Sequence, residues 1–292
     1  MHNYTTYMVS YGEISLFGAD VSGPRLGICA GNVTIVDTRI DSSGYGCKSD
    51  QGLGRGHQSG HCGGSGGSSA GIGGYGGMIV AEDENSDDAL KCADHYPKAY
   101  ALPDASYFEG SGGASGLSSE NSGGAGGGII RVSAIDDLIM QRSSILSNGL
   151  PGEQFGLGSA SGGGAGGSIE IVTRTLRGDS KVEVRGGNGS QGGGGGGSGG
   201  RLIVSFLRGQ SPVADSRYYW SGSHSLAGGI SGKSFPALGE EFYSGENGQE
   251  GLTIASKCFG GMSGPFCAPC PAGTFKYDFS YAECQRCENK PH

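Results

Sequence analysis

Glycine content constrains this chain more than any other feature of its sequence. Of 292 residues, 63 are Gly, roughly 22% against a usual share of about 7%. Each Gly inside a helix costs about 0.5–1 kcal/mol relative to Ala, which disfavours a helical bundle. The glycines do not recur at every third position, which excludes collagen. No apolar run approaches the roughly 18 residues of a membrane-spanning helix.

A short pattern, Gly followed by alternating apolar residues, recurs along the chain and indicates half-buried strands. Its copies are Gly31-Asn32-Val33-Thr34-Ile35, 128–132, 167–171, 200–204 and, more weakly, 77–81. An apolar residue with a Gly four positions later follows three of the copies: Ile40 with Gly44, Ile145 with Gly149, and Val182 with Gly186. The predicted unit is therefore strand, turn, strand, then a glycine-rich excursion.

Each predicted unit is too small to bury its own apolar face, so neighbouring units must stack. We therefore predict an all-β chain whose glycine-rich repeat domain, residues 1–255, is a parallel β-solenoid of the β-helix type. An antiparallel β-sandwich with polyglycine loops is the alternative. The acidic segment at about 81–103 is predicted to be an insertion loop, and residues 256–292 a small disulfide-rich module.

The longest glycine tracts lie directly before predicted strands, at 123–128, 162–167 and 192–200. They could be flexible linkers. Alternatively they are ordered, extended chains packed side by side, since only Gly lets backbones approach so closely. The regular placement of the tracts favours the ordered interpretation.

Cysteine usage points to an oxidising compartment, because nine cysteines are too many for a typical cytosolic protein without a metal. They are Cys29, Cys47, Cys62, Cys92, Cys258, Cys267, Cys270, Cys284 and Cys287. The last four form two CxxC pairs, which could also hold a tetrahedral zinc ion.

Several stretches resemble a family of large glycine-rich surface proteins of plants and protists with an ephrin-receptor-like, or TNF-receptor-like, cysteine module. They are Ala30 to Ile35, Gly44-Tyr45-Gly46-Cys47-Lys48-Ser49, Gly162 to Ile169, Gly186 to Ser190, and Gly264-Pro265-Phe266-Cys267-Ala268-Pro269-Cys270-Pro271-Ala272-Gly273-Thr274-Phe275-Lys276. The resemblance implies the ectodomain of a membrane-anchored or wall-facing protein, with no catalytic residues to carry over. It also implies that the C-terminal cysteines form disulfides rather than a zinc site.

The odd cysteine total is then explained if one late residue, such as Cys287, pairs with a partner beyond residue 292, so that the module is truncated here. The four upstream residues, Cys29, Cys47, Cys62 and Cys92, are expected to form two bridges. Three connectivities are open for them.

Other candidate chemistry is sparse. His57, His61 and Cys62 could bind a metal, but they lie in a Gly/Ser loop that does not fix their geometry. Arg177-Gly178-Asp179 spells an adhesive tripeptide, yet it lies where the repeat needs a turn. Asp136 and Asp137 occupy the equivalent turn one repeat earlier, and nothing singles them out as a glycosidase pair.

We therefore expect a non-catalytic extracellular or cell-surface fragment without a cofactor, whose role is structural, adhesive or ligand-binding. The net charge of −8 and the pI of about 5.2 argue against nucleic acid as a partner. We expect the partner to be a protein or glycan at the cell surface. Membrane anchoring would lie outside this chain. Sequons at Asn3, Asn32 and Asn188 are candidate glycosylation sites. A carbohydrate-active β-helix enzyme and a zinc protein remain the alternatives.

Overall fold

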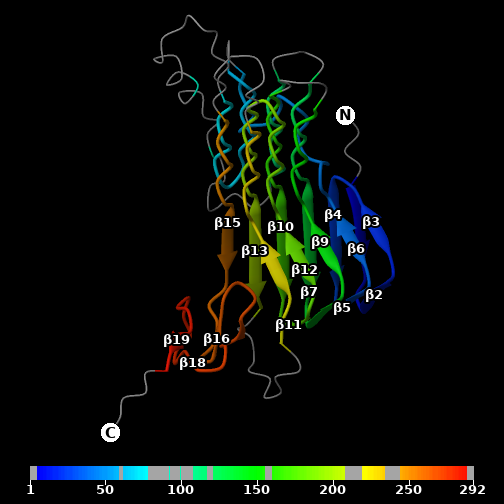
Figure 1. Cartoon of the computed structure of the whole chain (residues 1–292). Coiled ribbons are helices and arrows are strands. Elements are labelled where there is room, and N and C mark those ends of the chain that lie inside the picture. Colours follow the sequence, from blue (N-terminus) through cyan, green and yellow to red (C-terminus); the bar gives the residue numbers. More distant parts are fainter. Residues whose placement is uncertain are drawn as a thin grey trace, which may run out of the picture.

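The computed structural model describes residues 5–58, 62–77, 92, 99, 108–116, 121–154, 160–207, 219–233 and 244–287, and the protein is all-β. Most strands lie in three parallel sheets (Figure 1). The first sheet contains β1 (Thr5–Val9), β4 (Arg25–Ala30), β7 (Ile129–Ala134), β10 (Ser168–Thr173), β13 (Arg201–Phe206) and β15 (Leu252–Ala255). The second contains β2 (Glu13–Phe17), β5 (Asn32–Val36), β8 (Asp137–Gln141) and β11 (Thr175–Gly178). The third contains β3 (Asp20–Ser22), β6 (Arg39–Asp41), β9 (Ser144–Leu146), β12 (Lys181–Glu183) and β14 (Ser223–Ser225).

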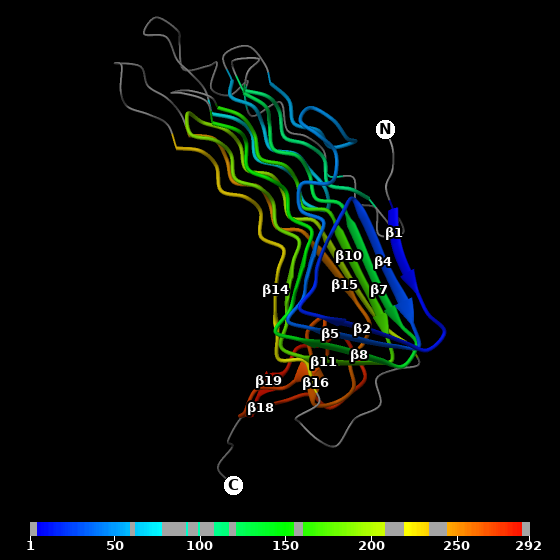
Figure 2. The same ribbon diagram turned by 90° about the vertical axis from the view of Figure 1, so that its right-hand side faces the viewer.

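Consecutive strands belong to different sheets, so the chain winds through the three sheets in turn and each round stacks on the one before. Figure 2 shows the resulting triangular outline. Alternate residues point inward, and a single apolar core runs through the stack, with Ile130, Ile169 and Leu202 side by side in register. The parallel pairing is compatible with the predicted β-solenoid, and it excludes the antiparallel sandwich.

The repeat pattern located the strands of two sheets and missed most of the second. The copies at 128, 167 and 200 are neighbours in the first sheet. The predicted second strands around Ile40, Ile145 and Val182 all lie in the third sheet. The copy at 31 instead forms β5 in the second sheet, and 78–81 lies outside the described residues.

Two segments that we predicted to be turns are only partly turns: Asp136 and Asp179 lie at corners between strands, whereas their neighbours belong to strands. Asp137 opens β8, and Arg177-Gly178 closes β11. In β8, the inward residues Leu138 and Met140 are fully buried, and this two-residue alternation is the signal of a strand. The charged residues on the outer face, such as Asp137, made this segment look like a turn in the sequence.

The corners between the second and third sheets use left-handed backbone. Gly18, Asp37, Arg142 and Gly178 have φ values of 59°, 51°, 46° and 123°. Behind them a column of buried hydroxyls joins successive coils. The Thr38 N–H donates to Ser143 Oγ at 3.1 Å, and the Ser143 N–H donates to Ser180 Oγ at 3.0 Å. The column therefore satisfies the polar groups that each tight corner buries.

Between the third sheet and the next strand of the first, the chain leaves the coils in long glycine-rich passes that lie side by side (Figure 1). We call these passes the glycine-chain bundle. Its passes are 43–58, 62–69, 71–77, 108–116, 121–128, 147–154, 160–167, 184–191, 194–200, 226–233 and 244–251.

The C-terminal module packs against the last coil. It contains two antiparallel pairs, β16 (Met262–Ser263) with β17 (Ala268–Pro269), and β18 (Thr274–Phe275) with β19 (Gln285–Arg286). The ring of Phe266 stacks on Trp220 with 4.7 Å between centroids, and both rings are buried. Phe266 belongs to the same apolar cluster as the coils, so the module packs on the core of the last coil.

Candidate functional site

Hydrogen bonding in the glycine-chain bundle has a period of three residues. Along the pass 160–167, the N–H groups donate in rotation to the same three neighbouring passes. The bonds, each 2.9 Å long, are Gly162 to Ala114, Gly163 to Gly195, Gly164 to Leu150, Ala165 to Ser111, Gly166 to Ser198 and Gly167 to Ser147. The pass 194–200 shows the same rotation. Three residues per turn is the period of a polyproline II helix, and such a helix has no internal hydrogen bonds. The passes 160–167 and 194–200 are therefore extended helices that are hydrogen-bonded only to neighbouring passes.

Each inner pass is surrounded. The carbonyls of 160–167 accept N–H groups from 121–128, 62–69 and 184–191, while its own N–H groups go to three other passes. The long excursion after β6 supplies 62–69 and 108–116, which lie against the passes from later coils. We predicted an insertion loop within this excursion, at about 81–103. Of that range, only Cys92 and Ala99 are among the described residues.

Close contact between passes explains the glycines. A Cβ at Gly164 would lie 2.1 Å from the carbonyl oxygen of Ala125, and one at Gly163 would lie 2.0 Å from that of Gly187. At the centre of the bundle the side chains are small, as at Ala114 and Ala165, which are fully buried. The predicted side-by-side packing of the tracts is thus confirmed for the described passes.

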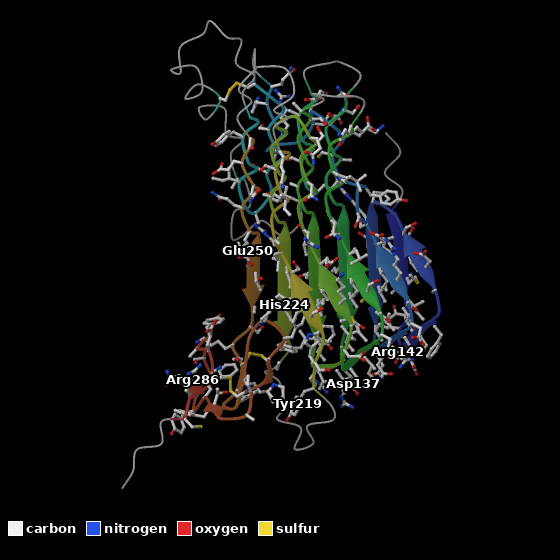
Figure 3. All side chains as sticks on the ribbon, in the orientation of Figure 1. Asp137, Arg142, Tyr219, His224, Glu250 and Arg286 are labelled. Atoms are coloured by element: carbon white, nitrogen blue, oxygen red, sulfur yellow. A yellow bond between two sulfur atoms is a disulfide. The ribbon has the colours of Figure 1, made fainter. Side chains whose placement is uncertain are left out.

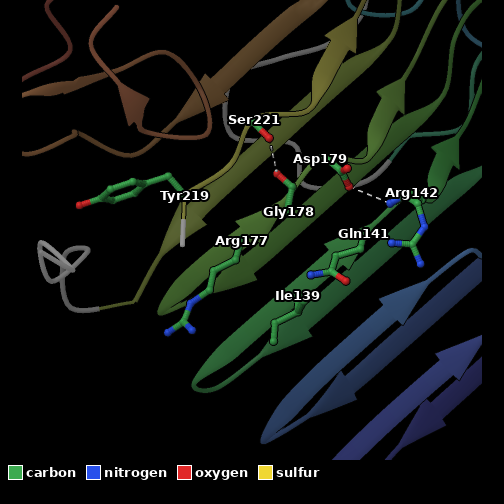
Figure 4. Close-up of a pocket in the computed structure, with 8 residues that line it drawn as sticks. All are labelled: Ile139, Gln141, Arg142, Arg177, Gly178, Asp179, Tyr219 and Ser221. Carbon is green, nitrogen blue, oxygen red and sulfur yellow. Dashed lines mark hydrogen bonds between the residues drawn. The ribbon is translucent and has the colours of Figure 1, made fainter. Parts of the chain in front are cut away.

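A hollow of about 390 Å³ lies where the second sheet meets the third, beside the last coils. Figure 4 shows its lining: Ile139, Gln141, Arg142, Arg177, Gly178, Asp179, Tyr219 and Ser221. Residues from three successive coils form it, so no local pattern could have revealed Gln141, Tyr219 or Ser221 as neighbours.

The Arg177-Gly178-Asp179 tripeptide lines this hollow with its two charges apart. Arg177 and Asp179 point in opposite directions from Gly178 (Figure 4). Asp179 Oδ1 accepts the backbone N–H of Arg142 at 2.8 Å, and an Arg177 guanidinium nitrogen lies 3.6 Å from Asp137 Oδ1. Both charges therefore have partners within the fold.

Two further carboxylates of the second sheet and its corners, Asp136 and Asp37, are paired with arginines. Asp136 lies 2.8 Å from an Arg174 nitrogen. Arg142 grips Asp37 through two hydrogen bonds of 2.8 and 2.7 Å, a bidentate pair. Hydrogen bonding from Arg142 lowers the pKa of the Asp37 carboxyl, which keeps that carboxyl ionised. These pairs join successive coils along the second sheet.

Six of the nine cysteines form disulfides: Cys62–Cys92, Cys258–Cys267 and Cys270–Cys284. Figure 3 shows the bonds of the C-terminal module. One bridge, not the expected two, joins the upstream cysteines, because Cys29 and Cys47 are unpaired.

Distance explains why Cys29 and Cys47 do not pair. Cys29 pairs in register with Ser133, while the residue before Cys47 bonds to Gly126. Seven extended residues separate Ser133 from Gly126, on the order of 20 Å, and a disulfide needs Cα atoms within about 7 Å. The exposed Cys29 thiol faces solvent, and burial together with the Glu109 carboxylate raises the pKa of the half-buried Cys47 thiol.

Most of the cysteines proposed as metal ligands are bonded in disulfides. Cys267, Cys270 and Cys284 of the two CxxC pairs are in disulfides, and Cys287 is exposed and unpaired. Cys62 is bonded to Cys92, and His61 lies outside the described residues. Within the described ranges no group of three or more His, Cys, Asp or Glu side chains could hold a metal ion.

A buried lysine organises the C-terminal module. Lys276 Nζ donates to the carbonyls of Cys258, Met262 and Ser280 at 3.0, 3.1 and 2.7 Å. These carbonyls come from separate turns of the module, so one ammonium group joins them. No charge or spacing in the sequence marks Lys276 as buried, although it lies within the cysteine-module motif.

Two of the three sequon asparagines are described, and both are exposed. Asn32 Oδ1 accepts the Asp137 N–H at 3.2 Å, and Asn188 Oδ1 accepts the Ile230 N–H at 2.9 Å. Each side chain therefore bridges to the next coil or pass through its oxygen. Asn3 lies outside the described residues.

No family model matches the chain, and neither a curated protein nor a solved structure matches it. The resemblance to glycine-rich surface proteins thus stays a prediction. Within the part of the chain that the structure describes, no helix is long and apolar enough to cross a membrane.

Proposed function

We propose that this chain is a non-catalytic part of an extracellular or cell-surface protein, in which a β-solenoid and its glycine-chain bundle form a rigid scaffold. The scaffold serves a structural, adhesive or ligand-binding role. The observation that carries the proposal is the three-residue rotation of hydrogen bonds in the bundle.

Hydrogen bonds between neighbouring passes are expected to make the glycine-chain bundle rigid. Ordering one residue costs about 1–2 kcal/mol of conformational entropy, and Gly loses the most. A chain that needed only a spacer would leave its glycines disordered at no such cost. Here the lateral hydrogen bonds and close packing offset that entropy, which supports selection for a stiff body.

The bundle also displays side chains at regular intervals. On the pass 184–191, Arg185 and Asn188 are exposed while Val184, Gly187 and Ser190 are buried. Three residues of a polyproline II helix rise about 9 Å. A face with side chains at fixed spacing supports presentation to a protein or glycan partner.

Three disulfides are consistent with an extracellular or secreted protein. The resemblance in the cysteine module adds support for a cell-surface parent protein. The module and the bundle project from different ends of the coils in Figure 1, so the scaffold would hold the two at a fixed separation.

Non-reducing mass spectrometry of the secreted full-length product, with surface biotinylation of intact cells, tests this proposal. We expect the three disulfide-linked peptide pairs and labelling without cell lysis. Free thiols at Cys267, Cys270 and Cys284 with about one zinc ion per chain would contradict it.

A further inference from the structure

The hollow beside the last coils is built from two rows of outward side chains. Parallel register aligns β8, β11 and the segment before β14 through Gly178, which pairs with Met140 on one side and Trp220 on the other. The residues next to this line form two rows, each with one residue from each of three successive coils (Figure 4). The carbon row is Ile139, Arg177 and Tyr219, and the polar row is Gln141, Asp179 and Ser221. Neighbouring strands lie about 4.8 Å apart, so each row is about 10 Å long.

The polar row presents hydrogen-bonding groups to solvent, because Gln141, Asp179 and Ser221 are all exposed. Asp179 Oδ1 accepts the Arg142 N–H at 2.8 Å, and Ser221 Oγ lies 3.3 Å from the Gly178 carbonyl oxygen. Among the described residues, none bonds to the side-chain amide of Gln141 or to the second carboxylate oxygen of Asp179. An amide and a hydroxyl both donate and accept, so the row offers donors and acceptors together.

The carbon row supplies apolar surface along the other side of the hollow. Ile139 and Tyr219 are half-buried, so each leaves part of its apolar surface exposed. Arg177 lies between them in register and adds a planar guanidinium, which packs well against flat surfaces. The hollow therefore has an apolar side and a hydrogen-bonding side.

The arginines of the hollow already face carboxylates of the fold. Arg142 holds Asp37 through hydrogen bonds of 2.8 and 2.7 Å, and an Arg177 nitrogen lies 3.6 Å from Asp137 Oδ1. A charged ligand would have to compete with one of these partners, whereas a neutral ligand would not. The volume of about 390 Å³ lies within the range of about 300–1,000 Å³ that is usual for ligand pockets.

We propose that this hollow binds a neutral saccharide, which rests on the ligand-binding role proposed above and gives that role its ligand class. A sugar ring carries hydroxyl groups that both donate and accept, and these groups suit the polar row. Its C–H face is apolar and suits the carbon row. The length of about 10 Å accommodates two linked rings, one over each pair of neighbouring coils.

Calorimetric titration of the whole chain with cellotetraose, xylotetraose and mannotetraose tests the proposal, and tetragalacturonate is the charged comparison. We expect at least one neutral saccharide to bind with a Kd of about 1 mM or tighter, and tetragalacturonate to bind at least about tenfold more weakly. Gln141→Leu and Ser221→Ala each remove hydrogen bonds to the ligand and should weaken binding about fivefold. Gln51→Leu is the matched control, because Gln51 is also exposed but lies in the glycine-chain bundle.

Equal melting temperatures confirm that the variants fold, and non-reducing mass spectrometry confirms the three disulfides of the sample. If the disulfide-bonded chain binds none of the neutral saccharides up to about 10 mM, the saccharide site is refuted and the proposed extracellular scaffold stands. Tighter binding of tetragalacturonate, or equal affinity of Gln141→Leu, Ser221→Ala and Gln51→Leu, would also overturn the inference.

Discussion

Replacing Gly164 by Ala tests the packing of the glycine-chain bundle at its centre. The added Cβ would lie 2.1 Å from the Ala125 carbonyl oxygen and 2.4 Å from its carbon, both backbone atoms. Ordinary van der Waals contact of a Cβ begins at 3.4 Å, so the two passes must separate by about 1 Å. Overpacking of this kind costs about 1–3 kcal/mol.

That separation also stretches hydrogen bonds on either side. Gly164 donates to Leu150 at 2.9 Å and accepts from Gly187 at 2.8 Å, and each bond contributes about 1 kcal/mol. Together the terms predict a loss of about 3–5 kcal/mol. For a chain of this size, that loss lowers the melting temperature by about 10 °C.

The matched control is Gly12→Ala, where the nearest atom to the new Cβ is 4.0 Å away. Ala reduces the entropy of the unfolded chain, so this variant should be neutral or more stable by up to about 1 kcal/mol. Thermal unfolding followed by circular dichroism compares the two. Equal melting temperatures would refute the close packing of the passes.

Three further predictions concern the corners, the module and the thiols. Ser143→Ala leaves the buried Thr38 N–H without its acceptor, so unfolding should require about 1–3 kcal/mol less in denaturant titration; an unchanged midpoint would count against the hydroxyl column. Lys276→Met leaves three carbonyls without their shared donor, and hydrogen exchange should quicken across 258–287 but not in the coils; unaltered exchange would show that the ammonium does not hold the module. Maleimide should label Cys29 before Cys47, because the thiolate is the reactive form and burial raises the pKa of Cys47; equal rates by mass spectrometry would rule this out.

The sequence predicted the strands that face one apolar core and follow a glycine tract. Ile130, Ile169 and Leu202 were found because each begins a two-residue alternation two positions after a Gly. Two strands of the second sheet, β8 and β11, were missed because they are short and carry Asp137 and Arg177 on their outer faces. A polar outer row beside a buried inner row looks like a turn when the strand has only four or five residues.

The contacts of the bundle and of the hollow could not be derived from local patterns. Gly163 bonds to Gly195 and accepts from Gly67, so the partners lie 32 and 96 residues away. Glycine has no side chain that could specify a register. The sequence therefore predicted that the tracts pack side by side, but not which tracts are neighbours. The disulfide connectivity was also left open by the sequence, because pairing depends on where the coils place each Cys.

Amide hydrogen exchange of the described passes 160–167 and 194–200 tests the central claim most directly. Every N–H in the rotation donates to a neighbouring pass, so these glycine tracts should exchange as slowly as the neighbouring strands β10 and β13. Exchange at the rate of an unstructured peptide, while β10 and β13 stay protected, would show that the tracts are linkers and would contradict the account.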